Sequence, residues 1–573
     1  MEPHILIWLY KQDPTVVYTP SAHAAELPET LSENWSWLVG YLAGVDGGLP
    51  AEGTFTPHSA GISLLKSLQA TGPAFAGKVH GSCSFIVWRA STRDLLVVSD
   101  RGGQYPWYYI ASRDRFWVAR SPASLAALGV VERRPNPAAL VGHMHGVAHP
   151  KGDSCYAGIA RLGPGEYLWV REGKLEHGCY WRPEPKPLLK PDTLSGYAAA
   201  YRSLLTRIIA EYLPAESGIT GLTLSGGLDS GSIAAGVSLL GRAHDVQAIS
   251  YVFQELAEAD EEAYLTATAA QTGLHLTKLV ADRYWTLSHS AGLETEPADP
   301  SVSYYVELWD ALFATARQLG IRVLMTGYHG DLLFGDNVFG YPDLLLTGQW
   351  RRLLAELQEH RRHSTMSFSR ILKLMLLAPI LTAYIPLRRW AIREPVPWLR
   401  PDLYDVYVEL YGRSERSYRL LPGRLHRLLT LRRSMLIVQA EIMSRRAARF
   451  GLELRHPLLD HRFTEFALSL PTSATFQAAQ RKIVVRAALK DVLPASVVNM
   501  RGKIYLGALG HRGLREREQA KVWPLLTNMR SAELGLVDEG RIRQFYADYL
   551  AGKHQSTLFW HTLCVEDWLR RYF

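Results

Sequence analysis

Cysteine is scarce in this chain. Its 573 residues include only four cysteines, Cys83, Cys155, Cys179 and Cys564, and no two of them form a Cys-x-x-Cys pair. This scattering excludes a disulfide framework and a zinc site built from cysteines, and it indicates a reducing compartment. The first residues also lack the charged and then apolar pattern that is typical of a signal peptide. We therefore expect a cytoplasmic protein.

A long apolar run is missing as well. Residues 371–387 form the strongest candidate, but they include Lys373, Pro379 and Pro386 and are fewer than the roughly 20 residues that a membrane span requires. A pair of helices that is buried or faces a partner is expected there. Contact of this segment with a membrane or a transporter is left open, although nothing in the sequence indicates it.

Basic residues are only slightly more numerous than acidic residues. The 63 basic and 55 acidic residues give a net charge of +8 on a large surface. This bias fits phosphate-bearing or acidic ligands, and we expect no nucleic-acid partner. The hydrophobic fraction of 47% is ordinary for a globular protein, and the length predicts about three to four domains.

Two regions of different pattern follow one another along the chain. Up to residue 184, short apolar runs such as 84–88 and 95–99 alternate with turn signals, which predicts a β-rich domain. A proline-rich stretch at 185–193 is expected to be an extended linker. The second domain, 194–573, begins with alternating helical and strand patterns.

The sequence pattern of the second domain predicts an α/β fold. The first domain is expected to be α+β. Helices are expected at 197–212 and 304–319, among strands at 219–224, 246–253, 275–280 and 321–326. Strands that are separated by helices predict a doubly wound parallel sheet with helices on both faces. Ligands of such sheets bind beyond the carboxyl ends of the strands. A helical insertion is expected at about 341–421.

The most informative segment, Ser-Gly-Gly-Leu-Asp-Ser at 225–230, lies between the first of these strands and a helix. Gly226 and Gly227 let the backbone approach an anion, and the helix start attracts phosphate. Ser225 and Ser230 supply hydroxyl donors, and Asp229 supplies a carboxylate that suits Mg²⁺. An ordinary capped turn is the alternative, but the full hexapeptide favours a phosphate site. It resembles the PP-loop of the ATP pyrophosphatases, in particular the asparagine synthetase superfamily, whose members adenylate a carboxylate and release pyrophosphate.

The fourth strand ends in a second glycine-containing loop, 326–335, which places Asp331 at another sheet edge. If the first and fourth strands are adjacent, Asp229 and Asp331 can share one Mg²⁺ and its phosphate oxygens. The loop is similar to the superfamily's second signature, Gly-x-Gly-x-Asp, with His329 in place of the second glycine. The resemblance implies ATP and Mg²⁺, with adenine contacts expected from Leu224, Phe253, Thr326 and Gly327.

Tyr328 distinguishes this chain from asparagine synthetases, which carry glutamate there. The chain resembles β-lactam synthetase and carbapenam synthetase, in which a tyrosine and a downstream glutamate take a proton from an intramolecular amine. The stretch 451–460 resembles the family's Gly-x-Glu-x-Arg-x-Pro-Phe-Leu-Asp pattern, which implies that Glu453 is this glutamate. The stretch 493–505 is similar to a family segment whose lysine stabilises the transition state, which implies this role for Lys503. A core tyrosine, a salt-bridged glutamate and an exposed lysine are the structural alternatives.

The N-terminal domain resembles the glutaminase domain that accompanies asparagine synthetases, at residues 100–102 and 106–109 in particular. Those enzymes use a cysteine nucleophile at position two, where this chain has Glu2. Because no thiolate is available there, we expect a domain that does not hydrolyse glutamine and serves structure or substrate binding. The amine must then come with the substrate.

Together these resemblances imply an AMP-forming lasso peptide cyclase, or macrolactam synthetase. Such an enzyme adenylates an Asp or Glu side chain of a ribosomal precursor peptide and joins it to the peptide's N-terminal amine. A leader-peptide-binding protein and a leader protease of the same pathway are the expected partners. The alternatives are a β-lactam-synthetase-like or other small-molecule amide ligase, a catalytically silent scaffold, and a tRNA-modifying PP-loop enzyme. The peptide, the ring size and the oligomeric state cannot be read from the sequence.

Overall fold

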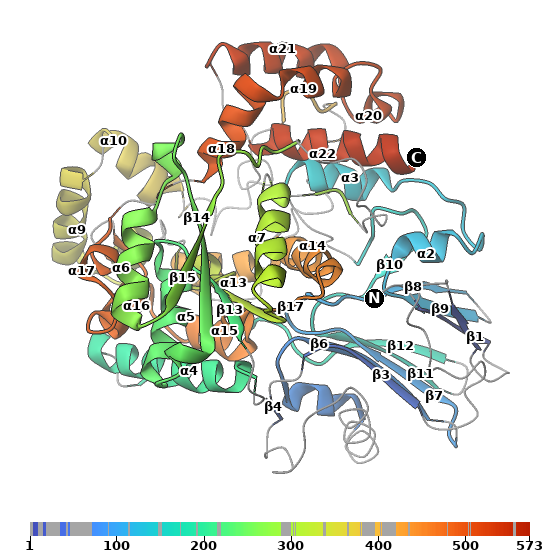
Figure 1. Ribbon diagram of the computed structural model, residues 1–573, viewed down its shortest axis with the longest axis horizontal. Coiled ribbons are helices and arrows are strands. Elements are labelled where there is room, and N and C mark those ends of the chain that lie inside the picture. Colours follow the sequence, from blue (N-terminus) through green and yellow to red (C-terminus); the bar gives the residue numbers. More distant parts are fainter. Residues whose placement is uncertain are drawn as a thin grey trace.

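The chain folds into an N-terminal region of antiparallel sheets, a central parallel sheet with helices, and a group of C-terminal helices (Figure 1). The computed structural model describes residues 4–9, 15–18, 35–41, 44–45 and 72–573, apart from gaps at 90, 113–114, 147–151, 172–173, 191–192, 215–218, 288–298, 302, 304, 336–339, 364–365, 379, 381–395, 401–402, 404–419, 434–435, 478–479, 502–503, 505 and 554–556.

The N-terminal region contains two five-stranded antiparallel sheets, which confirms the predicted β-rich domain. One sheet, ordered β10-β8-β9-β1-β2, comprises β1 (His4–Leu9), β2 (Thr15–Tyr18), β8 (Tyr108–Ala111), β9 (Arg115–Ala119) and β10 (Ala160–Arg161). The other, ordered β12-β11-β7-β6-β3, comprises β3 (Trp35–Gly40), β6 (Cys83–Arg89), β7 (Asp94–Val98), β11 (Glu166–Arg171) and β12 (Lys174–Cys179).

Strands β6 and β7 of the second sheet are covered on both faces, which explains why they are nearly continuous in apolar residues. Successive side chains of a strand point to opposite faces. Leu95 and Val97 of β7 therefore join Phe116 and Val118 of the other sheet in one core. Their neighbours on β7 pack instead against the short helix η1 (Gly72–Lys78) in a second core.

The central sheet has the order β15-β14-β13-β16-β17, and all of its pairings are parallel. Its strands are β13 (Thr220–Thr223), β14 (Val246–Val252), β15 (His275–Val280), β16 (Val323–Thr326) and β17 (Glu453–Arg455). The predicted parallel sheet is confirmed, and the first and fourth predicted strands, β13 and β16, are neighbours. The fifth strand, β17, lies in a region that the sequence predicts to be helical.

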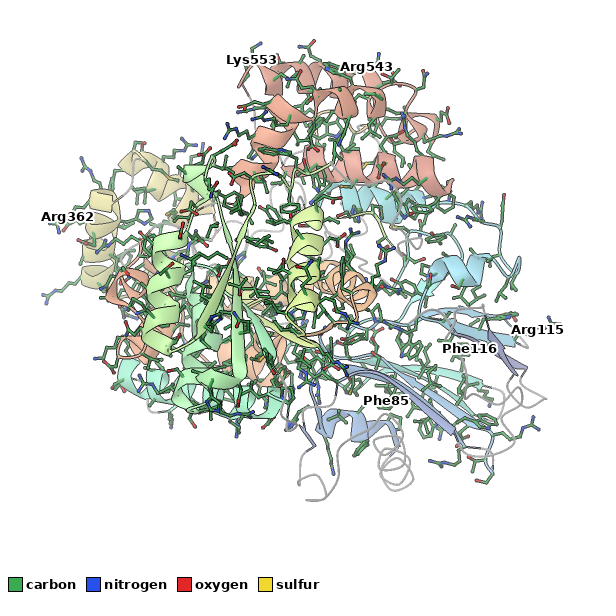
Figure 2. All side chains as sticks on the ribbon, viewed as in Figure 1. Phe85, Arg115, Phe116, Arg362, Arg543 and Lys553 are labelled. Atoms are coloured by element: carbon green, nitrogen blue, oxygen red, sulfur yellow. The ribbon has the colours of Figure 1, made fainter. Side chains whose placement is uncertain are left out.

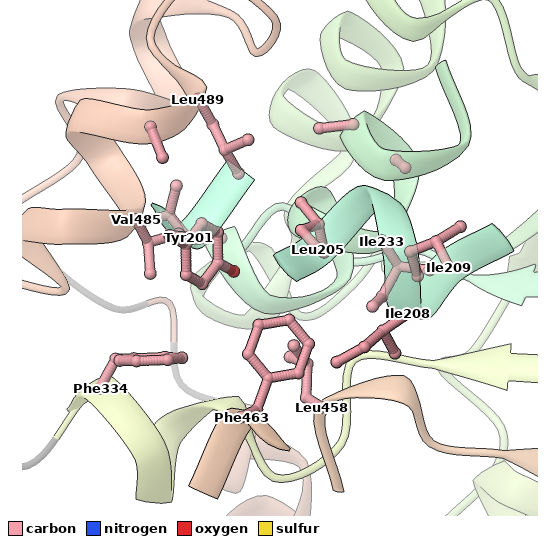
Figure 3. Close-up of a cluster of buried hydrophobic side chains, with 14 of the residues drawn as sticks. Tyr201, Leu205, Ile208, Ile209, Ile233, Phe334, Leu458, Phe463, Val485 and Leu489 are labelled. Carbon is pink, nitrogen blue, oxygen red and sulfur yellow. The ribbon is translucent and has the colours of Figure 1, made fainter. Parts of the chain in front are cut away.

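Helices cover both faces of this sheet, as predicted. One face carries α4 (Leu194–Tyr212), α5 (Leu228–Leu239), α6 (Glu262–Thr272) and α16 (Ile483–Leu489), which share one core. Figure 3 shows part of this core, in which Leu205 and Ile209 of α4 approach Ile233 of α5. The other face carries α7 (Val306–Gln318) and α14 (Leu436–Arg449), whose buried residues pack with those of β14, β16 and β17.

Helices also form the outer parts of the molecule. The predicted insertion contains α8 (Gly340–Leu346), α9 (Trp350–His363) and α10 (Phe368–Ile371), which continues as a wider turn to Leu377. Residues 381–395 and 404–419 of the insertion lie outside the described residues. No helix in the described part of the chain is long and apolar enough to cross a membrane.

The C-terminal helices α19 (Gln519–Leu525), α20 (Arg530–Glu533), α21 (Glu539–Leu550) and α22 (Thr557–Tyr572) share a core with α3 (Pro137–Met144) of the N-terminal region. The helix before them, α18 (Gly507–Arg512), packs through Leu509 in a separate cluster with Phe253 and Leu256. Basic side chains lie on the outer edges of these helices and of α9, as Arg362, Arg543 and Lys553 show (Figure 2).

Buried polar contacts join the N-terminal region to the central sheet. Arg161 pairs with Glu441 of α14 at 3.0 Å, and Tyr108 donates a hydrogen bond to the same carboxylate at 3.1 Å. Gln104 donates to the hydroxyl of Ser444 at 2.8 Å and to the carbonyl of Leu454, on β17, at 3.0 Å. Since these groups are out of contact with water, the interface fixes the position of β17.

Candidate active site

The loop between β13 and α5 is held in shape by its own serines. The backbone N–H of Ser225 donates to the hydroxyl of Ser230 at 2.9 Å, and the two hydroxyl oxygens are 2.9 Å apart. The N–H of Gly227 donates to the Ser225 hydroxyl at 3.3 Å. Both serines of the predicted phosphate loop therefore also serve to build it.

The start of α5 has the features that suit an anion. Gly227 is its N-cap residue, and no side chain caps the helix. The N–H of Gly226 donates to the carboxylate of Glu261 at 3.0 Å, so this loop already holds a negatively charged group. The positive end of the helix dipole adds to this attraction, and phosphate oxygens fit the same donors.

The loop after β16 packs directly against the loop after β13. A Cβ atom on Gly327 would lie 2.4 Å from the backbone nitrogen of Ser230, and one on Gly330 would lie 2.3 Å from a carboxylate oxygen of Asp229. At Gly327 the clash would be with backbone, so only glycine fits there, whereas a Cβ at Gly330 would displace the Asp229 carboxylate. Close packing of the two loops brings Asp331 near Asp229, as predicted from the order of the strands.

Lys482 lies between the two aspartates. Its ammonium nitrogen is 2.7 Å from a carboxylate oxygen of Asp229 and 2.7 Å from one of Asp331. Lys482 follows the short strand β19 (Gln480–Arg481) and has a left-handed backbone, with φ 58°, at the start of α16. Burial lowers the pKa of Lys482, but the charges of Asp229 and Asp331 outweigh burial and raise it, so the ammonium stays charged.

A cavity of about 620 Å³ opens at these loops, at the carboxyl ends of β13 and β14. Its volume lies within the range of small-molecule sites. Four of its lining residues are cationic, and apolar and aromatic side chains from β14, α17 (Ala495–Val498) and the segment after it form much of the rest. The lining residues are Leu224, Ser225, Gly226, Gly227, Leu228, Asp229, Tyr251, Phe253, Ala259, Glu261, Tyr305, Asp331, Arg481, Lys482, Arg486, Val497, Met500, Arg501, Ile504 and Leu506.

Most of the residues predicted to bind ATP line this cavity. They are Leu224, Ser225, Gly226, Gly227, Asp229 and Phe253. Ser230 and Thr326 are buried behind it, where they shape the two loops. The chemistry of the donors fits Mg²⁺, which proteins usually hold with one or two carboxylates while substrate phosphates and water complete the shell. The described residues contain no group of three or more His, Cys, Asp or Glu side chains that could hold a metal ion without phosphate.

Tyr328 lies beyond the end of β16, beside two buried histidines. The centre of its ring is 5.2 Å from that of His456 and 6.5 Å from that of His329. His329, which replaces a glycine of the family signature, has φ 81°, a conformation that glycine adopts readily. Burial raises the pKa of Tyr328 well above its usual value, so its hydroxyl stays protonated.

The structure does not bring Glu453 to Tyr328, and this part of the predicted site needs correction. Glu453 pairs with Val323, the first residue of β16, whereas Tyr328 lies two residues beyond Thr326, the last residue of that strand. Three residues of parallel strand separate the two ends by about 10 Å. The described ion pair of the Glu453 carboxylate is with Arg455, at 2.6 Å.

Lys503, the predicted transition-state lysine, lies outside the described residues. Sequence reasoning missed Lys482 and the cationic residues Arg481, Arg486 and Arg501 of the cavity. The pair Arg481-Lys482, directly before a helix, was the available signal for a phosphate-binding segment.

The cysteines of the N-terminal region are poorly suited to nucleophilic catalysis. Burial raises the pKa of Cys83 to about 12 and that of Cys155 well above its usual value. The pKa of Cys179, on an exposed position of β12, is also raised, chiefly by partial desolvation of the thiol. A thiol must ionise to act as a nucleophile, and these three stay protonated at neutral pH.

Comparison with known proteins agrees with this geometry. The profile of the asparagine synthase family matches residues 200–570, and that of a glutamine amidotransferase domain matches residues 49–181. A putative glutamine-hydrolysing asparagine synthetase of Mycobacterium bovis is 25% identical over 558 residues, which cover 89% of this chain and 81% of the relative. The amidase chyE of Penicillium rubens is 22% identical over 527 residues, which cover 82% and 75%.

Solved structures add little to these matches. The glutamine phosphoribosylpyrophosphate amidotransferase of B. subtilis, complexed with ADP and GMP, has a TM-score of 0.20 at 9% identity and covers 57% of this chain and 69% of that one. The family profile, in contrast, spans both loops that supply Asp229 and Asp331, together with Lys482. The chain therefore belongs to the asparagine synthase family, and this membership implies an ATP-dependent ligase.

Proposed function

We propose that this ligase forms a macrolactam in a ribosomal precursor peptide. It adenylates the side chain of an aspartate or glutamate and joins it to the N-terminal amine of the same peptide, with AMP and pyrophosphate as by-products. The observation that carries the ATP-dependent step is the position of Lys482 between Asp229 and Asp331, beside the uncapped start of α5. The choice of an intramolecular amine rests on Tyr328, where asparagine synthetases carry glutamate.

The first step is attack of the substrate carboxylate on the α-phosphorus of ATP, which breaks the bond to pyrophosphate. The N–H groups at the start of α5, with the hydroxyls of Ser225 and Ser230, hold the departing phosphates. Mg²⁺, when bound with ATP, would be held by Asp229 and Asp331 and would neutralise phosphate charge. The ammonium of Lys482 is then free to move from the carboxylates to the phosphate oxygens.

The second step is attack of the amine nitrogen on the activated carbonyl carbon, which breaks the bond to AMP, and the proton that the amine loses passes to the departing AMP phosphate. Tyr328 lies at the crest of β16, next to the loop of Asp331, and accepts a hydrogen bond from this amine in the proposed mechanism. Lys503 remains a predicted contributor to stabilisation of the tetrahedral carbon.

The amine is proposed to come from the substrate and not from glutamine. The raised pKa values of Cys83, Cys155 and Cys179 argue against a glutaminase thiolate at these positions. The N-terminal region then serves as a support for the central sheet, through contacts such as that of Arg161 with Glu441.

A peptide substrate is favoured by the helical insertion beside the site. Arg501 lines the large cavity and pairs with Glu359 of α9 at 3.7 Å, so the insertion borders the nucleotide site. A second cavity, of about 230 Å³, lies between α8, α9 and residues 471–476, and its walls include Tyr341 and Phe476. It can take an apolar side chain of the peptide. A leader-peptide-binding protein and a leader protease remain the partners that we propose.

A small-molecule amide ligase of the β-lactam-synthetase type is the second candidate. It is compatible with the same ATP site and with Tyr328, and it would leave the second cavity without a role. Both candidates use an amine that belongs to the substrate, so the size of the accepted substrate separates them.

The test uses the purified full chain with ATP, Mg²⁺ and linear peptides that carry a free N-terminal amine and one aspartate or glutamate at successive positions. Parallel reactions contain β-amino acids with a second carboxylate, or aspartate with ammonia or glutamine. We expect loss of one water from a peptide, with equal amounts of AMP. Turnover of only the small amino acids would favour the second candidate, and asparagine formation would overturn both.

A further inference from the structure

Hydrogen bonds connect Tyr328 to the N-terminal region through His456. The backbone N–H of Tyr328 donates to the hydroxyl oxygen of Thr326 at 3.2 Å, and this oxygen lies 2.6 Å from Nδ1 of His456. The backbone N–H of His456 donates to the hydroxyl of Tyr41 at 3.3 Å. The ring and the backbone of His456 are therefore both held in place.

The other ring nitrogen of His456 finds no partner in the part of the chain that the structure describes. His456 is fully buried, and its Nε2 makes no hydrogen bond to any of these residues. Buried N–H groups without an acceptor are very rare in proteins, because losing the hydrogen bond to water is costly. This favours the tautomer in which Nδ1 carries the hydrogen and donates to Thr326. Nε2 then presents a lone pair in the interior.

Tyr328 needs such an acceptor nearby. A protonated phenol offers its oxygen lone pair to an incoming amine best when its own O–H donates to another group, because hydrogen bonds in a chain strengthen one another. Glu453 cannot be that group, since it lies at the opposite end of β16. The ring of His456 packs beside that of Tyr328, with 5.2 Å between the ring centres, and it carries the acceptor Nε2.

We propose that His456 is a positioning residue for amide formation: Nδ1–H fixes the Thr326 turn, and Nε2 accepts the hydrogen bond of the Tyr328 hydroxyl when the amine binds. The role rests on the proposed function, in which Tyr328 faces the amine. It takes the place that the family resemblance gives to Glu453. Burial and the nearby His329 lower the pKa of His456 to about 3, so its ring is neutral and acts as an acceptor, not as a store for the proton.

His456→Asn tests this role. The asparagine amide can still donate to Thr326 from the position of Nδ1, but it has no atom at the position of Nε2. With a peptide that the wild-type chain cyclises, we expect amide formation to slow about tenfold, the effect of one lost hydrogen bond. Pyrophosphate exchange into ATP, which reports adenylation, should stay within about twofold of wild type. Equal slowing of both steps, or of neither, would overturn the proposal.

A double variant shows whether His456 acts through Tyr328. If it does, His456→Asn adds little to Tyr328→Phe, because the phenol that it positions is already gone. If the rate loss of the double variant equals the product of the two single losses, the two residues act independently, which would contradict the proposal. His145→Asn is the matched control, since His145 is also buried and bonded through Nδ1, to the carbonyl of Val141 at 2.9 Å, in the N-terminal region. It should leave both steps unchanged.

A substrate-free measurement separates this inference from the proposed function. In the full chain with ¹⁵N-labelled histidine rings, the signals that disappear in His456→Asn belong to His456. We expect a protonated Nδ1 and an unprotonated Nε2 across neutral pH. A protonated Nε2 would overturn the positioning role even if the peptide is cyclised. A failure of all peptides would instead contradict the proposed function.

Discussion

The ammonium of Lys482 lies 2.7 Å from a carboxylate oxygen of Asp331, and the same nitrogen lies 2.7 Å from Asp229. One cation thus neutralises two acidic side chains that would otherwise repel each other at the crest of the sheet. Leaving two carboxylates together without a partner is costly, because like charges at short distance disfavour ionisation. An internal cation therefore holds the two carboxylates together at this edge of the sheet.

Lys482→Met should slow pyrophosphate release about 100-fold or more, because a positioned cation at developing phosphate charge commonly contributes this much. Pyrophosphate formation from ATP and the cyclised peptide measures it. Lys278→Met is the control, since Lys278 forms an ion pair of the same length, 2.7 Å, with Glu262 at the surface. Near wild-type turnover of the Lys482 variant would remove this residue from the mechanism.

Asp229→Ala and Asp331→Ala should each abolish pyrophosphate release. Each removes a carboxylate that the proposed Mg²⁺ and ATP require, and each leaves Lys482 with only one partner. Asp245→Ala, which breaks an ion pair with Arg242 far from the cavity, is the control. Full cyclisation by either active-site variant would show that the metal assignment is wrong.

Tyr328→Phe should leave adenylation intact and slow ring closure. The change removes a hydroxyl at the crest of β16 and keeps the ring that packs beside His456. Exchange of pyrophosphate into ATP measures the first step, and peptide mass measures the second. Ring closure at the wild-type rate would mean that Tyr328 serves only the packing of the core. Equal slowing of adenylation and ring closure would mean that Tyr328 acts in the ATP site.

Gly327→Ala should inactivate the site and lower stability by at least about 2 kcal/mol, because the added Cβ overlaps backbone atoms of Asp229 and Ser230 in the first turn of α5, which cannot rotate away as a side chain can. Chemical denaturation and pyrophosphate release measure the two effects. Gly77→Ala is the control, since no described residue lies within 4 Å of the Cβ that it adds. A stable and active Gly327 variant would mean that the two loops are less tightly packed than described.

The sequence was enough to place the two aspartates, because strand order in a parallel sheet decides which loops meet. Asp229 and Asp331 each follow a strand with a clear pattern, so their meeting could be predicted. Lys482 could not, because no strand or motif ties its segment to the crest of the sheet. Glu453 was misplaced for a related reason: a motif gives the order of residues, whereas the register of β17 on β16 decides which end of the sheet they reach.

Arg161→Met should lower the free energy of unfolding by about 3 kcal/mol, because it leaves the buried Glu441 with less compensating charge. Arg171→Met should change it by about 0.5 kcal/mol or less, since Arg171 and its partner Glu176 are both half exposed. The comparison of the two unfolding midpoints checks both values. Equal midpoints would show that the interface between the N-terminal region and α14 contributes little.

Acid should destabilise the fold well before its carboxylates are protonated. Burial lowers the pKa of His456 to about 3 and that of His329 to about 4, against 6.5 for an ordinary histidine. Between pH 6.5 and the lowered pKa values of the folded state, the unfolded chain binds more protons than the folded chain. The free energy of unfolding therefore falls as the pH drops below 6.5 and recovers when the pH is raised again. One such histidine contributes about 1 kcal/mol per pH unit in this range. Unfolding midpoints at pH 7 and pH 5 should therefore differ clearly in the wild type, and this difference should be smaller in His456→Asn. His244 lies at an exposed position, so His244→Asn should keep the wild-type difference. An unchanged difference in His456→Asn would mean that this ring is not held neutral by the fold.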